Sequence, residues 1–466
     1  MNTKFYIASR LSKIKINAEE KSQIEHYFSK LSANQVEQDN FFQYCKNWKL
    51  APWIFIQMNR NGLINKLTEK TMLDFKAVYD KVRLENENRN NEASNFLAEF
   101  TKEGIDVAIL KGNIFIHSVY QDVGYKKMND FDMLIHLDDW PKVQEIYFRL
   151  GYIPLGFGWG GEKGKAAKYS HAGLSFMSPN YKCITGTQWG IKSPTSKYTI
   201  KAADIWKETL DFEFNGLKIK QLSPEYNVLH LILHMGVYKI GIRDCMDIYN
   251  LLLADENFKE NKFIELCKKS NAVDKAWFTL QLTNLCSGTT SLSLLEKLRP
   301  EKENFLVRRL NARLRMSEKT GDMQLSYNDY FHDVEMVVFT ISIFPEFHKK
   351  LFLYFKLFKI MFWPKADLVL KLSDYTAFPG IFKWVGARFK APYYTFSLIG
   401  EEIGIKITIL LFVKTFFDIL ISLKNYIFKK ESYIEYLTNR GLNVEEIKNA
   451  VKEDDRSDIE KEKLDT

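Results

Sequence analysis

Two stretches of sequence decide the fold that we expect: GIDVAILKG at residues 104–112 and MNDFDMLIHL at residues 128–137. In the first, a helical pattern ends at a glycine and the short apolar run Val107–Leu110 follows. That order is typical of a helix, a tight turn and a buried strand. In the second, Phe131–Leu137 is another short apolar run, and it predicts a second strand.

The sequence around these stretches predicts more strands and many helices. Apolar spacing predicts helices at 114–120 and at 140–150, the latter with two aspartates before it, an early proline and Gly151 at its end. Further strand-like stretches are Tyr152–Phe157, Tyr169–Met177 and Lys182–Ile191. The pattern is helical before residue 100, with polar turns expected at Asn34, 59–62 and 86–91, and helical again beyond Pro224. The expected class is α/β (α+β), a mixed sheet core flanked by N-terminal and C-terminal helical regions.

These patterns divide the chain of 466 residues, a length typical of two or three domains. We expect an N-terminal helical region at 1–99, a sheet core at 100–222, a helical domain at 223–330, a basic aromatic helical region at 331–430, and a helix with an acidic disordered tail at 431–466.

The composition excludes several classes of protein. Hydrophobic residues make up 46% of the chain and charged residues 27%, which excludes intrinsic disorder over most of it. The five cysteines are odd in number and form no CxxC pair, so neither a disulfide framework nor a thiolate zinc site is expected. The opening stretch MNTKFYIASRLSKIKINAEEK has no apolar run of the length that a secretory signal needs, so we expect a cytoplasmic protein.

The most informative local feature is Asp130-Phe131-Asp132 at the start of the second predicted strand. Side chains alternate along a strand, so the two carboxylates point the same way and can approach one pair of divalent ions. Two such ions can clamp a triphosphate and its attacking group in line, and Mg²⁺ prefers carboxylate and phosphate oxygens. Two exposed acids at a strand edge are the structural alternative. Leu110-Lys111-Gly112-Asn113, after the first strand, adds a glycine turn of the kind that approaches phosphates.

Here the sequence resembles bacterial nucleotidyltransferase-like proteins related to the DNA polymerase β superfamily. The resemblance runs from Trp48 to Leu253, with a fainter likeness through IFPEFHKK and MFWPKADLVLKL. Its blocks, in order, are GIDVAILKG, VYQDVGYKKMNDFDMLIHL, LGYIPL, ITGTQWGI, LKIKQLSPEYNVLHLILH and RDCMDIYNLL.

The resemblance implies a site of metal ions and nucleotide. Asp130 and Asp132 would be the catalytic, metal-binding pair, holding Mg²⁺, with two ions as an option, and a nucleoside triphosphate would be the substrate. Lys111, Gly112 and Asn113 would correspond to the turn beside the phosphates. Lys127, or its neighbour Lys126, lies where the family usually has an arginine, which keeps a cation there but not bidentate recognition.

One later strand departs from the family pattern. The family usually has an acidic residue two positions before a histidine and a tryptophan, whereas this sequence reads Gly186-Thr187-Gln188-Trp189. The acid would ordinarily complete the metal site or take the proton from the acceptor hydroxyl. Its loss leaves two hypotheses open: a transferase in which another carboxylate, such as Asp122 or Glu213, substitutes, and a degenerate binding or regulatory module.

The other candidate functional residues can each be explained by a structural role as well as by a functional one. His230 and His234 are one helical turn apart, which can bind zinc, but Leu231 stands where a metalloprotease helix has glutamate, so packing or pocket roles are favoured. GFGWGGEKGK at 156–165 lacks the Walker pattern and is interpreted as a mobile loop over the site. His171 follows it, as a substrate contact or a surface strand histidine. Arg243, Asp244 and Asp247 face the cleft or form a structural ion pair.

The segment 338–430 has fourteen Lys plus Arg and six Asp plus Glu, a balance equal to the whole chain's net charge of +8, and it has 15 of the 35 phenylalanines. Its longest apolar run is interrupted by charges, which argues against a spanning helix. Three interpretations remain: a helix pair that closes a second core, peripheral attachment to an anionic membrane, and nucleic-acid binding, which no motif accompanies. The tail 451–466, with seven acidic and four basic residues, is expected to be disordered.

The preferred hypothesis is a transferase that moves a nucleoside monophosphate from Mg-NTP to a hydroxyl of an unknown small-molecule, sugar or protein acceptor. The degenerate module is the second, and an RNA-directed or antitoxin-like partner protein is the third.

Overall fold

The computed structural model describes residues 3–301 apart from 33, 156–169, 236–240, 255–257 and 289–291, residue 315, and residues 347–447 with interruptions between 364 and 432. The glycine-rich stretch 156–165 and the acidic tail 451–466 lie outside the described residues.

A seven-stranded mixed sheet forms the centre of the fold, in the order β3-β4-β5-β2-β1-β7-β6. The strands are β1 (Ala108–Ile109), β2 (Phe131–Leu134), β3 (Ile153–Pro154), β4 (Phe176–Met177), β5 (Ile184–Gln188), β6 (Leu210–Phe214) and β7 (Leu217–Gln221). The strand β2 pairs parallel with β5 and antiparallel with β1. The expected mixed α/β fold, with helical regions before and after the sheet in the sequence, is confirmed. Each predicted strand is shorter in the structure than the apolar stretch that predicted it.

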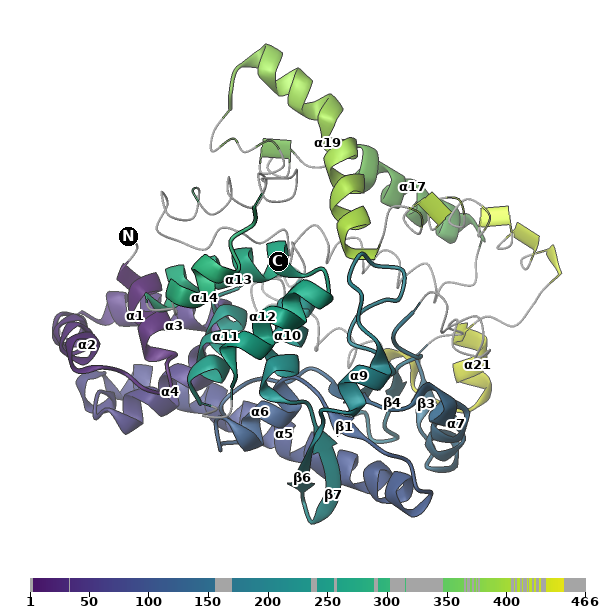
Figure 1. The fold of residues 1–466 in the computed structure, drawn as a ribbon, viewed down its shortest axis with the longest axis horizontal. Coiled ribbons are helices and arrows are strands. Elements are labelled where there is room, and N and C mark those ends of the chain that lie inside the picture. The colour runs from purple at the N-terminus through teal and green to yellow at the C-terminus, as the bar shows by residue number, and fades with distance from the viewer. Residues whose placement is uncertain are drawn as a thin grey trace.

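Helices surround this sheet (Figure 1). Those before it are α1 (Thr3–Leu11), α2 (Ala18–Leu31), α3 (Gln35–Asn47), α4 (Ala51–Arg60) and α5 (Glu69–Lys102), with a 3-10 turn at Ile64–Lys66. Within the sheet region are α6 (Gly112–Ser118), a 3-10 turn at Leu137–Asp139, α7 (Trp140–Arg149) and α9 (Ala202–Trp206). After it come α10 (Pro224–His234), α11 (Ile242–Ala254), α12 (Glu260–Lys269), α13 (Val273–Ser287), α14 (Leu292–Lys297), α17 (Phe347–Phe362), α19 (Ile381–Ile403) and α21 (Tyr433–Asn439).

The two faces of the sheet are covered by different helices. Phe131 on β2 contacts Phe96 of α5, with ring centroids 5.6 Å apart, and α7 packs on the same face through Tyr147. The opposite face has its own apolar cluster, in which Leu134 of β2 meets residues of α9 and α10. Because side chains alternate along a strand, Asp132 shares this second face with Leu134.

The polar turn predicted at 86–91 is wrong, because α5 continues through it without a break. The polar side chains that suggested a turn point inward: Asn86, Arg89 and Asn90 are at most 5% exposed. Asn86 and Arg89 hydrogen-bond to the loop before β2, and Asn90 to His117 of α6, and these bonds replace the water that such residues would bind in a surface turn.

The hairpin of β6 and β7 was not predicted. Its two-residue turn is Asn215-Gly216, and both residues have positive φ, at 48° and 79°. Asn-Gly is the sequence that favours this turn type, so the signal was present in the chain.

One continuous hydrophobic core joins residues of α1 to those of α14 through the face of the sheet that α5 covers. All five cysteines are buried, and none of them forms a disulfide. The division into regions at residues 99, 222 and 330 stays a prediction.

Candidate functional site

The two aspartates lie where β2 begins, next to the middle of the sheet. Asp130 directly precedes β2, and Asp132 is its second residue and only 4% exposed. On the neighbouring strand β5, Gly186 is the register partner of Asp132. The alternation of side chains places Gly186 and Gln188 on the same face as Asp132, beneath α9 and α10.

The helix α5 fixes the loop that leads into β2. The Asn86 amide donates hydrogen bonds to the carbonyl oxygens of Val123 at 2.6 Å and Lys126 at 2.8 Å. The Arg89 guanidinium donates to the carbonyl oxygen of Asn129 at 3.2 Å. These contacts hold the backbone immediately before Asp130, so the polar stretch of α5 positions the site from the far side of the sheet.

Both carboxylate oxygens of Asp132 have nitrogen partners. Lys111 Nζ lies 2.8 Å from Oδ2 and Gln188 Nε2 donates to Oδ1 at 2.9 Å. Lys111 occupies the turn between β1 and α6 with φ of 54°, a left-handed conformation that non-glycine residues rarely adopt. Strained backbone of this kind concentrates at functional sites, and here it brings the ammonium to the aspartate.

The Asp130 carboxyl interacts with several charged neighbours, which change its pKa. Burial, followed by the negative charge of Asp132, raises the pKa of the Asp130 carboxyl to about 6, while Lys111 and Arg89 act in the opposite direction. A carboxyl whose pKa is raised by burial and by a neighbouring carboxylate is stabilised in its charged form by a cation placed between the two groups.

Gly186 is the position at which the resemblance implies a third acid. A Cβ added there would lie well inside contact distance of Asp132 Oδ1, 3.3 Å from Asp132 Cγ and 3.6 Å from Asp130 Oδ2. The Asp132 side chain therefore occupies the space that a side chain at 186 would need. Of the alternative acids, Asp122 accepts hydrogen bonds from Tyr79 and from the backbone of Gly124.

The structure places the expected phosphate-side residues around this strand. The missing Cβ of Gly112 makes room for Met128, whose Cε would be 2.5 Å from it. Asn113 is fully buried, and its amide donates to the Asp130 carbonyl at 2.9 Å, so it holds the start of β2. Lys127 is half-buried on the loop before Asp130. Its predicted role, like those of Gly112 and Asn113 toward nucleotide, stays a prediction.

Lys126, on the loop before β2, forms a buried ion pair with Asp247 of α11. Lys126 Nζ contacts Asp247 Oδ2, and the Tyr120 hydroxyl donates to Asp247 Oδ1 at 2.5 Å. Burial lowers the pKa of Lys126, and Asp247 partly offsets this. Lys126 and Lys127 both lie where the resemblance implies an arginine. Of these two, Lys126 forms a structural ion pair with a residue of α11.

A group of cations and imidazoles that the sequence did not bring together lies beside Asp132. Burial, then Lys192 and Lys111, lowers the pKa of His171 to about 4. Burial, then Lys111, His171 and Lys192, lowers that of His230. Both histidines are candidates from the sequence, each on its own, whereas Lys192 and Arg89 were not predicted. Lys192 follows β5 by only a few residues, so the rule that strand ends gather site residues could have found it.

The residues of the site fit one Mg²⁺. The two carboxylates lie together against Gly186, whose missing side chain leaves room for them, and Gln188 Oε1 is buried without a hydrogen-bond partner among the described residues. Mg²⁺ is commonly bound by one or two carboxylates with phosphate oxygens completing its shell. Within the described ranges no cluster of three or more His, Cys, Asp or Glu residues exists, so a third carboxylate for a second ion is not supplied there.

A family model described as uncharacterised nucleotidyltransferase matches residues 34–288, which is more than half of the chain. The chain belongs to this family. The match spans the helices α3–α13, the whole sheet and both aspartates, and it supports a nucleotidyltransferase-like function with a nucleotide substrate. No significant match was found among curated proteins or among solved structures.

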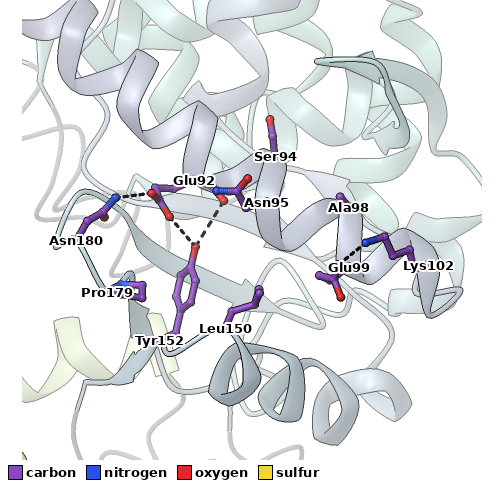
Figure 2. Close-up of a pocket in the computed structure, with 10 residues that line it drawn as sticks. All are labelled: Glu92, Ser94, Asn95, Ala98, Glu99, Lys102, Leu150, Tyr152, Pro179 and Asn180. Atoms are coloured by element: carbon purple, nitrogen blue, oxygen red, sulfur yellow. Dashed lines mark hydrogen bonds and ion pairs between the residues drawn. The ribbon is translucent and has the colours of Figure 1, made fainter.

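An open hollow of about 520 Å³ lies on another part of the molecule (Figure 2). It is lined by α5, Leu150, Tyr152 and the turn at Pro179 and Asn180, and the Tyr152 hydroxyl and Asn180 amide both point to Glu92. Neither Asp130 nor Asp132 lines it, so this hollow is separate from the candidate site.

Proposed function

We propose that this protein binds a Mg²⁺-nucleoside triphosphate complex at Asp130 and Asp132 and transfers the nucleoside monophosphate to a hydroxyl of a small-molecule, sugar or protein acceptor. One observation carries the proposal. The two carboxylates share one face of β2, with the Lys111 ammonium 2.8 Å from Asp132, in a chain of the nucleotidyltransferase family. In such a transfer the acceptor oxygen bonds to the α-phosphorus, the bond from that phosphorus to the oxygen of the leaving pyrophosphate breaks, and the hydroxyl proton passes to water.

The charged and the neutral residues of the site would have different roles. A bound Mg²⁺ supplies charge neutralisation and orientation for phosphate oxygens. Asp130 and Asp132 would hold it, and Lys111 would exchange part of its contact with Asp132 for a phosphate oxygen. Gln188 and Asn113 keep the two aspartates in place, through the Asp132 carboxylate and the Asp130 carbonyl. His171 and His230 are neutral at pH 7 because their pKa values are lowered, so they can bind substrate without adding charge.

Gly186 favours a second candidate, a binding or regulatory module that holds nucleotide without transferring it. The position lies opposite Asp132, where a third acid would stand, and Asp132 fills the space. Inserting an acid at 186 is therefore not a clean restoration, because Asp132 must first move.

The two candidates differ in whether the α-phosphate leaves the nucleotide. The purified protein is incubated with Mg²⁺ and each of the four ribonucleoside triphosphates, labelled at the α-phosphate, together with cell extract as the source of acceptor. Transfer predicts label in an acceptor and release of pyrophosphate, both lost in Asp132→Asn and kept in Asp211→Asn, which changes an exposed acid on β6. Nucleotide binding with no label transferred and no pyrophosphate released would favour the module.

A further inference from the structure

The exposed apolar side chains of this protein are concentrated in one region. Of the twenty-five large apolar side chains that are exposed in the described part of the chain, nineteen lie between residues 351 and 428. Figure 1 shows α17 and α19 of this region extending away from the sheet and its helices. Single exposed apolar residues are normal on a protein surface, whereas an extended set marks an interaction site.

The helix α19 separates its residues into three strips. One strip is apolar and exposed, with side chains 47–92% exposed: Ile381, Phe382, Val385, Phe389 and Tyr393. The strip that faces the protein contains the buried Ala387 and Ala391. Lys383 and Lys390 are exposed and seven residues apart, so they lie together along the edge of the apolar strip.

The described helical residues between 406 and 428 also have exposed apolar side chains. Their exposed apolar members recur at spacings of three and four: Ile409, Leu410, Val413, Phe417, Leu420, Leu423, Ile427 and Phe428. That spacing places them on one side of a helix. Lys406 and Lys424 are the exposed lysines among the described residues of this range, and their spacing from Leu410 and Leu420 places them on the same side.

The helix α17 joins the same surface. Phe352 and Phe355 are 67% and 69% exposed, with the exposed Lys356 and Lys359 beside them. The end of α17 packs against α19, where the Arg388 guanidinium carbon lies 4.4 Å from the ring centroid of Trp363. The two helices are thus in contact, and each has exposed aromatic residues and lysines.

We propose that α17, α19 and the described helical residues between 406 and 428 bind in the plane of an anionic lipid bilayer, with the apolar side chains below the headgroups and the lysines among them. Charge argues for this partner: the segment 338–430 has fourteen basic and six acidic residues, and the rest of the chain is neutral overall. An amphipathic helix with exposed aromatic residues and bordering lysines is typical of such binding. Among the helices that the structure describes, none is long and apolar enough to cross a membrane.

A second copy of the chain is the other occupant that an apolar surface could take. It would place like charges against one another, because the same lysines border the strips on both copies. A bilayer of phosphatidylserine meets them with opposite charge.

The test is flotation of the full-length protein with two kinds of vesicle, phosphatidylcholine alone and an equimolar mixture of phosphatidylcholine and phosphatidylserine, at low salt. We expect the protein to float with the mixed vesicles and much less with the neutral ones. The double variant Lys383→Gln/Lys390→Gln should lower the partition coefficient on mixed vesicles about 30-fold, or about fivefold for each lysine. The variant Phe382→Ser/Phe389→Ser should lower it more than tenfold.

Matched controls separate this surface from the rest of the molecule. Leu73→Ser/Leu84→Ser changes two exposed apolar residues of α5, which are 49% and 59% exposed, and should float like the wild type. Asp132→Asn should also float normally, because the proposal does not depend on the nucleotide site. Failure of the wild type to float with mixed vesicles would overturn the proposal without reference to any variant. So would equal flotation of the Phe382/Phe389 variant, or a wild-type oligomer in light scattering that this variant dissociates.

Discussion

Replacement of Gly186 by alanine tests the geometry of the site most sharply. The new Cβ would lie well inside contact distance of Asp132 Oδ1 and 3.3 Å from Cγ. The carboxylate must therefore move, and Gln188, which donates to that oxygen at 2.9 Å, must lose or lengthen its hydrogen bond. Overpacking costs about 1–3 kcal/mol, and a hydrogen bond to a charged group contributes about 1.5–3 kcal/mol. Because one displacement causes both effects, we expect a loss of about 3 kcal/mol in the free energy of unfolding.

Urea unfolding of four proteins measures this loss: the wild type, Gly186→Ala, Asp132→Ala and the double variant. In Asp132→Ala the obstructing carboxylate is absent, so adding Gly186→Ala should cost less than about 1 kcal/mol, and the cycle should give a coupling of about 2 kcal/mol. Gly190→Ala is the matched control, because a Cβ there would be 3.5 Å from His171 Cβ, an ordinary contact. An equal cost of Gly186→Ala in both backgrounds would refute the described approach of Asp132 to β5.

Three further predictions concern the surroundings of the site. The pKa of His171 is lowered from 6.5 to about 4, so between these pH values the unfolded chain binds more protons than the folded one. The free energy of unfolding therefore falls as the pH decreases through this range. His171→Gln should lose this part of the pH dependence, measured by urea unfolding at about pH 5 and about pH 7. Asp247→Asn leaves Lys126 buried without its partner and should cost about 3–5 kcal/mol in the same assay. Asn86→Ala removes two hydrogen bonds to the loop before β2 and should lower the free energy of unfolding by about 2 kcal/mol.

Local patterns were sufficient to predict the elements that form the site. The apolar runs at 107–110 and 131–137 contain β1 and β2, and the proline, aspartates and glycine around 138–151 mark α7. These signals are local: periodicity, helix ends and turn residues. Asp130 and Asp132 on one face follow from strand alternation alone.

Contacts between distant segments could not be predicted in this way. The inward-facing Asn86 and Arg89 resemble a surface turn until the loop at 123–129 is known to lie beside them. Likewise, Gly186 could be recognised as a missing acid, but only the pairing of β5 with β2 shows that Asp132 fills its space. The exposure of α19 could not be predicted either, because a buried helix pair and an amphipathic membrane helix share the same composition.

Asp130 and Asp132 are proposed above all to bind the nucleotide with Mg²⁺. The most direct test of this proposal is the melting temperature of the wild type, Asp132→Asn and Asp211→Asn with Mg²⁺ and each of the four ribonucleoside triphosphates. A nucleotide at a hundred times its dissociation constant adds about 2.7 kcal/mol of stability, which a melt detects. We predict that at least one nucleotide stabilises the wild type and Asp211→Asn but not Asp132→Asn. Stabilisation of none of the three proteins, or of all three equally, would contradict the assignment of the site to these aspartates.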